Sequence, residues 1–145
     1  MRSGLAKFLA VAVVALVAAC AVPPAPGMQG ASLERRVFPN VNFDFDSYRI
    51  RPSDYGQLDQ VAVALNDPAL GGLRFEINGH TDVVGRLGYN ISLSQLRATE
   101  VVNYLASRGV PAGRMQAQGF GPLQLLDSSN PRSPVNRRVE IAATP

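Results

Sequence analysis

Two residues of opposite charge, Asp82 and Arg97, carry the clearest chemical signal in this sequence. Arg97 stands in the apolar face of an expected helix, between Leu93 and Val101, where another aliphatic side chain would be usual. A guanidinium held against a core-facing surface keeps its proton, so it needs an anion or several oxygen acceptors. Asp82, at the end of the preceding expected strand, is the nearest candidate partner in the sequence.

The pattern leaves two interpretations of this pair open. In the first, Asp82 and Arg97 form an internal salt bridge, which is the usual role of paired charges near the rim of a sheet. In the second, they stand apart as the two poles of a site for a zwitterion, with the aspartate facing an ammonium and the arginine facing a carboxylate.

The elements around the pair indicate a small α/β domain. Alternating apolar and polar residues and short apolar runs predict four strands, over residues 41–46, 73–77, 114–118 and 136–142. In the first of these, Val41, Phe43 and Phe45 are expected to face the core. Helical spacing predicts a helix from about Pro52 to Asn66 and a second one that ends near Gly109.

The second helix is expected to begin near Leu87, or at a capping box formed by Ser92 and Gln95. Either start places Arg97 close to the amino-terminal half of the helix, whose partly positive end attracts a carboxylate. Asp82 follows the strand over 73–77, and ligands in open α/β sheets tend to bind beyond the carboxyl ends of strands.

Short motifs follow one another in order between about residues 38 and 143. They are Asn78-Gly79-His80-Thr81-Asp82, Gly85, Asn90, Leu93-Ser94, Arg97-Ala98, Val101, Leu105, Gly109-Val110, Arg114, Gly119-Phe120-Gly121 and Asn136-Arg137-Arg138-Val139-Glu140-Ile141. This series resembles the signature of the OmpA-like peptidoglycan-binding domain. It is long, ordered and free of large gaps, so it is far more specific than any single short motif.

The resemblance implies both a fold and a ligand. The fold is an α/β (α+β) domain of βαβαββ order, with a mixed four-stranded sheet and helices packed on one face. Domains of this family hold the diaminopimelate residue of the peptidoglycan stem peptide without a covalent bond. The far end of diaminopimelate is a free amino acid, so the resemblance favours the two-pole interpretation of Asp82 and Arg97.

The resemblance also assigns supporting roles. The implied contacts to diaminopimelate are Asp82 and Arg97 as the principal residues, with Asn90, Arg137, Asp46 and Thr81 around them. By the residues alone, a helix-capping or turn role is favoured for Asn90. Alternation in the last strand directs Arg137 inward and Arg138 toward solvent or a salt bridge.

No enzymatic or metal chemistry is expected from these residues. His80 is the only histidine, and neither a second histidine nor an available thiol completes a metal-ligand set. No serine or cysteine lies in a recognised nucleophile setting, so His80 is interpreted as a structural or hydrogen-bonding residue. No cofactor is implied.

The first part of the chain predicts export and lipidation. Residues 1–19 read as a signal peptide, with a positive start and a short apolar run. Val17-Ala18-Ala19-Cys20 resembles a bacterial lipobox, so Cys20 is expected to carry acyl chains, and a plain secretory cleavage nearby is the alternative. Residues 20–36 form a proline-rich tether to the domain, which covers residues 37–145.

Charge argues against nucleic acid as a partner. The net charge of +3 comes from 14 basic and 11 acidic residues, and removal of Arg2 and Lys7 with the signal peptide leaves 12 basic residues and a net charge of +1. Arginines occur as isolated pairs and form no basic stripe.

Three functions are compared on this basis. The favoured one is a tether in the cell outer membrane, lipid-anchored, whose periplasmic domain grips peptidoglycan. The second is the Pal component of a Tol-Pal-like system that alternates between peptidoglycan and a TolB-like protein. The third is a wall-modifying hydrolase, which the absence of a nucleophile setting argues against. Separately, the segment 122–126 is more apolar than is usual in the family it resembles, and it is a candidate surface for another protein.

Overall fold

Residues 40–144 are described by the computed structural model, and they form one mixed four-stranded sheet. The strand order is β1-β4-β2-β3, in which β2 and β3 are parallel and the other pairs are antiparallel. The strands are β1 (Val41–Asn42), β2 (Arg74–His80), β3 (Met115–Gly121) and β4 (Arg138–Thr144). The expected signal peptide, Cys20 and the tether lie outside the described residues.

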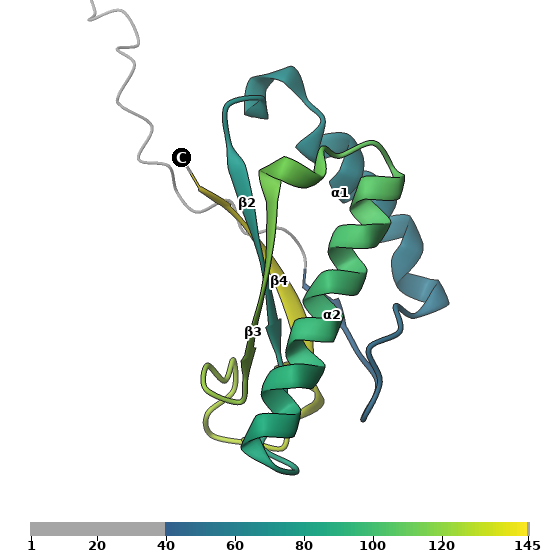
Figure 1. The fold of residues 1–145 in the computed structure, drawn as a ribbon. Helices are drawn as coiled ribbons and strands as arrows, with labels where there is room; N and C mark the ends of the chain where they lie inside the picture. The colour runs from purple at the N-terminus through teal and green to yellow at the C-terminus, as the bar shows by residue number, and fades with distance from the viewer. Residues whose placement is uncertain (1–39, 145) are drawn as a thin grey trace, which may run out of the picture. The chain divides into compact units, whose positions relative to one another are not determined.

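Two helices cover one face of this sheet (Figure 1). Helix α1 spans Tyr55–Leu65 and follows a short 3-10 turn at Pro52–Asp54, where proline fits because the first turn needs no amide donor. Helix α2 spans Leu87–Ser107 and runs from the carboxyl ends of β2 and β3 to their opposite ends (Figure 1). The predicted βαβαββ order and the placement of the helices are therefore confirmed.

The core lies between the sheet and the helices. Phe75 and Ile77 of β2, like Val139 and Ile141 of β4, are buried on either side of a half-buried glutamate, and the helices present apolar residues at helical spacing. Its fully buried members include Val41, Phe43, Leu58, Leu65, Ile77, Val101, Leu105 and Ile141. Arg97 is the largest side chain of this fully buried set, as expected from its place in the apolar face of α2.

Helix α2 lies directly on the backbone of β2 and β3 because glycines leave room for it. A Cβ atom added at Gly79 would stand 1.9 Å from the Ser94 carbonyl oxygen, and one at Gly119 would stand 2.5 Å from the Gln95 nitrogen. This close approach holds the first half of α2, including Arg97, beside the carboxyl ends of the parallel strands.

The first strand is shorter than predicted, and Phe45 does not face the core. β1 ends at Asn42, and the Phe45 side chain is 62% exposed. Alternation continues in the sequence, but side chains from other elements bind the carbonyls of residues 43, 44 and 47 and turn this segment away from the sheet. At Asp46 the segment adopts a left-handed backbone conformation, with φ of 54°.

Two further predictions need correction. Helix α2 begins at Leu87, so the proposed capping box is wrong, and Ser92 lies inside the helix with its hydroxyl donating to the Gly88 carbonyl at 3.1 Å. Arg138 is buried rather than exposed to solvent, because its Nη2 pairs with Glu140 Oε1 at 2.6 Å. The salt-bridge part of the Arg138 prediction is confirmed.

Candidate functional site

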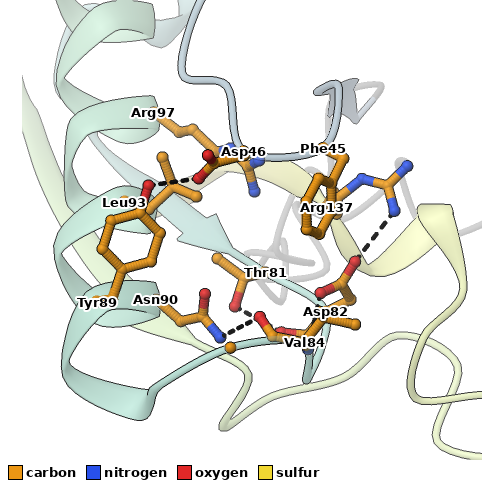
Figure 2. Close-up of a pocket in the computed structure, with 11 residues that line it drawn as sticks. Phe45, Asp46, Thr81, Asp82, Val84, Tyr89, Asn90, Leu93, Arg97 and Arg137 are labelled. Carbon is orange, nitrogen blue, oxygen red and sulfur yellow. Dashed lines mark hydrogen bonds and ion pairs between the residues drawn. The ribbon is translucent and has the colours of Figure 1, made fainter.

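All six predicted contact residues line one cavity of about 200 Å³ at the carboxyl end of β2 (Figure 2). They come from four separate segments: the loop after β1, the turn after β2, helix α2 and the residue before β4. These residues are Asp46, Thr81, Asp82, Asn90, Arg97 and Arg137.

Arg97 is held by backbone carbonyls. Its Nη1 donates to the His80 carbonyl at 3.0 Å, its Nη2 to the Asp44 carbonyl at 3.0 Å and its Nε to the Ser47 carbonyl at 2.7 Å. The guanidinium carbon also lies 5.2 Å from the centre of the Phe43 ring. These contacts satisfy a buried cation, and they fix its position relative to both β2 and the loop after β1.

Asp82 pairs with Arg137 and not with Arg97. One carboxylate oxygen accepts from Arg137 Nη1 at 3.0 Å, and the other accepts from the backbone amide of Val84 at 3.0 Å. Arg137 Nε also donates to the Phe43 carbonyl at 3.2 Å, so the Arg137 side chain ties the loop after β1 to Asp82. The internal salt bridge considered for Asp82 and Arg97 is therefore replaced by a pair with a second arginine.

Asn90 and Thr81 shape the turn between β2 and α2. The Asn90 side-chain amide donates to the Val84 carbonyl at 3.0 Å, and the Thr81 hydroxyl donates to the Asp82 carbonyl at 2.8 Å. Gly85 completes the turn with φ of 102°, which favours glycine. The turn role considered for Asn90 is thus present, and the same residue also lines the cavity.

The ionised groups of the cavity balance in charge. Asp46 and Asp82 are carboxylates, and Arg97 and Arg137 are guanidiniums. Burial, together with the neighbouring Arg137 charge, lowers the pKa of Arg97 to about 10, so Arg97 stays cationic at neutral pH. A cavity with two charges of each sign suits a ligand group that is itself neutral overall and carries both signs.

Sequence reasoning missed the aromatic part of the cavity. Tyr89 and Phe45 both line it, and the Tyr89 hydroxyl donates to a carboxylate oxygen of Asp46 (Figure 2). For Tyr89 a signal existed, because Tyr89, Leu93 and Arg97 recur every four residues on one face of α2. For Phe45, the alternating pattern wrongly predicted a side chain that faces the core.

His80 packs as a neutral residue behind the site. Its ring stacks on Phe120 with centroids 5.6 Å apart, and its Nε2 lies 3.8 Å from a carboxylate oxygen of Glu140. Burial, reinforced by Arg138, lowers the pKa of His80 to about 4, so the imidazole is uncharged at neutral pH. Within residues 40–144, no three His, Cys, Asp or Glu side chains lie where they could share a metal ion.

The fold and the cavity together define a small α/β domain with a charge-balanced pocket at its strand ends. The sequence model of the OmpA family matches residues 42–138, more than half of the chain. The chain belongs to the OmpA family. Within the described part of the chain, no helix combines the length and apolar character needed to span a membrane.

Two curated proteins illustrate the sequence similarity. Outer membrane protein A of Shimwellia blattae is 42% identical over 84 residues, which are 57% of this chain and 34% of that protein. The probable lipoprotein YiaD of Escherichia coli strain K12 is 35% identical over 108 residues, which are 73% of this chain and 48% of that protein. The chain therefore spans less than half of the length of these relatives.

Two solved structures extend the comparison. The peptidoglycan-associated lipoprotein from Burkholderia pseudomallei is 29% identical with a TM-score of 0.65, covering 83% of this chain and all 100% of that one. The cell wall anchor of the T6SS from Pseudomonas aeruginosa is 31% identical with a TM-score of 0.55, covering 71% of this chain and 77% of that one. Both are named for association with, or anchoring to, the cell wall.

Proposed function

We propose that this protein binds peptidoglycan without a covalent bond and holds the free amino-acid end of diaminopimelate in the cavity. One observation carries the proposal: four separate segments bring two carboxylates and two guanidiniums to a single cavity, so that their charges balance. The end of diaminopimelate is a zwitterion, with an ammonium and a carboxylate on one carbon. Its two charges therefore match the two signs of the site.

Arg97 is the proposed partner of the ligand carboxylate. A guanidinium has five N–H donors, and three different nitrogens of Arg97 each already serve one backbone carbonyl. One N–H on each terminal nitrogen is therefore not used by these carbonyls, and we propose that the ligand carboxylate accepts from them where Arg97 lines the cavity. Because the three carbonyls fix the side chain beforehand, little conformational entropy is lost when the ligand binds.

Asp82 and Asp46 are the proposed partners of the ligand ammonium. Asp82 is already paired with Arg137, so the ammonium shares this carboxylate with the guanidinium. The net charge of the site stays zero before and after binding, because the arriving group adds one charge of each sign. Asn90 and Thr81 support the site by holding the turn that carries Asp82.

The proposed cellular role is a tether between the outer membrane and the wall. The reported relatives are named as an outer membrane protein, lipoproteins and a cell wall anchor, not as enzymes. We propose that residues 1–19 direct export, that Cys20 carries the acyl chains and that residues 20–36 connect the anchor to the domain. Many weak sites acting in parallel then give firm attachment.

A second candidate is a Pal-like component that alternates between peptidoglycan and a TolB-like protein. Similarity to the Burkholderia lipoprotein supports it, and so does the loop after β3, where Leu123 is 65% and Leu126 is 56% exposed. Exposed leucines in this loop offer a surface for another protein. A pulldown in which peptidoglycan competes with the candidate protein distinguishes this role from a simple tether.

Sedimentation with purified sacculi tests the proposed function. The full-length chain in mild detergent is expected to sediment with diaminopimelate-type sacculi and to stay in solution with lysine-type sacculi, because a lysine side chain lacks the second carboxylate. Equal sedimentation with both types would contradict recognition of diaminopimelate. Assay of the supernatant for released wall fragments tests the hydrolase alternative in the same experiment.

A further inference from the structure

A second hollow, of about 500 Å³, adjoins the proposed site and contains an arginine. It is lined by Arg86, Gly88 and Tyr89, at the start of helix α2. Tyr89 also lines the diaminopimelate cavity, so the two hollows share one side chain as a common wall. Arg86 therefore lines a hollow that borders the first one at Tyr89.

Arg86 differs from Arg97 and Arg137, the two arginines that line the proposed site. The guanidiniums of Arg97 and Arg137 are occupied by backbone carbonyls and by Asp82. The Arg86 side chain is exposed, and within residues 40–144 it has no hydrogen-bond or ion-pair partner. Elsewhere in this part of the chain, Arg51, Arg108 and Arg138 are paired with carboxylates, whereas Arg49, Arg74 and Arg132 are exposed like Arg86 but line neither of these two hollows. Arg86 is thus an exposed cation in the neighbouring hollow, where an external anion can approach it.

The stem peptide supplies such an anion. Besides the free end of diaminopimelate, it carries the α-carboxylate of the neighbouring D-glutamate and a carboxylate at its C-terminus. Arg86 precedes Asn90 by four residues, which is roughly 6 Å along the helix axis. An extended peptide covers a similar distance, about 7 Å, in two residues.

We propose that Arg86 binds a second carboxylate of the stem peptide, so that this chain distinguishes ionised from amidated peptidoglycan. The inference rests on the proposed function, because it needs the diaminopimelate end to occupy the neighbouring cavity. An exposed ion pair of this kind changes affinity modestly, by on the order of threefold to fivefold. It also makes binding weaken at high salt, as expected for a charge at the rim of an interface.

Titration calorimetry on the full-length chain with four synthetic stem tetrapeptides tests this inference. The peptides carry the D-glutamate α-carboxylate and the C-terminal carboxylate each as the free acid or as the amide, so either source of the anion is identified. One of the two carboxylates is expected to be the partner of Arg86. Arg86→Gln should then bind peptides in which that carboxylate is free threefold to fivefold more weakly than the wild-type chain does. It should bind peptides in which that carboxylate is amidated as tightly as the wild-type chain does. Arg74→Gln, an exposed arginine at the other end of β2, is the matched control and should leave all four affinities unchanged.

The outcomes separate this inference from the proposed function. Four equal affinities for the wild-type chain, or an equal loss on all four peptides in Arg86→Gln, would overturn the role of Arg86 and leave the proposed function intact. A wild-type chain that binds none of the peptides would overturn the proposed function and this inference with it.

Discussion

Arg97→Ala is expected to destabilise the domain by about 3–5 kcal/mol, the range for removal of one partner from a buried charged network. The substitution leaves three backbone carbonyls without their donor and empties the site of the largest fully buried side chain. It also frees the loop after β1 from helix α2. Urea unfolding followed by circular dichroism measures the loss.

Two further variants separate the causes of this loss. Arg97→Lys keeps the charge but replaces three directed N–H groups by one ammonium, so it should recover only part of the stability. Arg108→Ala removes a half-exposed arginine that pairs with Asp59 at the carboxyl end of the same helix, and it should cost much less stability than Arg97→Ala. Wild-type stability in Arg97→Ala would show that the carbonyl contacts are not needed to hold the fold. Because Arg97 also holds the fold together through these carbonyl contacts, its alanine variant does not by itself test ligand binding.

Gly79→Ala is expected to destabilise the domain by about 3 kcal/mol or more, at the upper end of the cost of overpacking a core. The added Cβ would stand 1.9 Å from the Ser94 carbonyl oxygen, which belongs to the backbone of α2 and cannot rotate away. Helix α2 must therefore move off the sheet. Because α2 carries Arg97 and Asn90, the same shift should also open the proposed site.

Gly56→Ala is the matched control for this prediction. Gly56 lies in helix α1, where an added Cβ meets nothing within 4 Å. Alanine in place of glycine in an open helical position should stabilise the domain by roughly 0.5–1 kcal/mol. Thermal unfolding of both variants checks the pair, and a similar effect of the two substitutions would contradict the close packing of α2 on β2.

Much of the fold was predictable because its signals are local. The period of apolar residues marks the helices, and the arginine in the apolar column of α2 is visible in the amino-acid sequence itself. The turn at Gly85 and the stop at Gly109 lie where glycine supplies a positive φ. These features depend on residues within a few positions of one another, which a sequence pattern records directly.

The contacts that shape the site are not local, and the sequence did not reveal them. Phe45 continues an alternating pattern, yet its segment is turned away by Arg97 and Arg137, which lie about 50 and 90 residues further along. The partner of Asp82 proved to be Arg137, at a sequence separation of 55. Arg138 was expected to face solvent or to form a salt bridge. It forms the salt bridge but is buried, and the pattern could not show this because alternation gives the direction of a side chain and not what covers it.

The most direct measurement is calorimetric titration of the wild-type chain and of Asp82→Asn with a diaminopimelate-containing stem tetrapeptide. Asparagine keeps an oxygen that accepts from the Val84 amide, so the turn is preserved while the charge facing the ammonium is removed. We expect Asp82→Asn to bind at least about 30-fold more weakly, as for loss of one partner from a buried charge pair. A folded Asp82→Asn variant that binds as tightly as the wild-type chain would contradict the two-pole site.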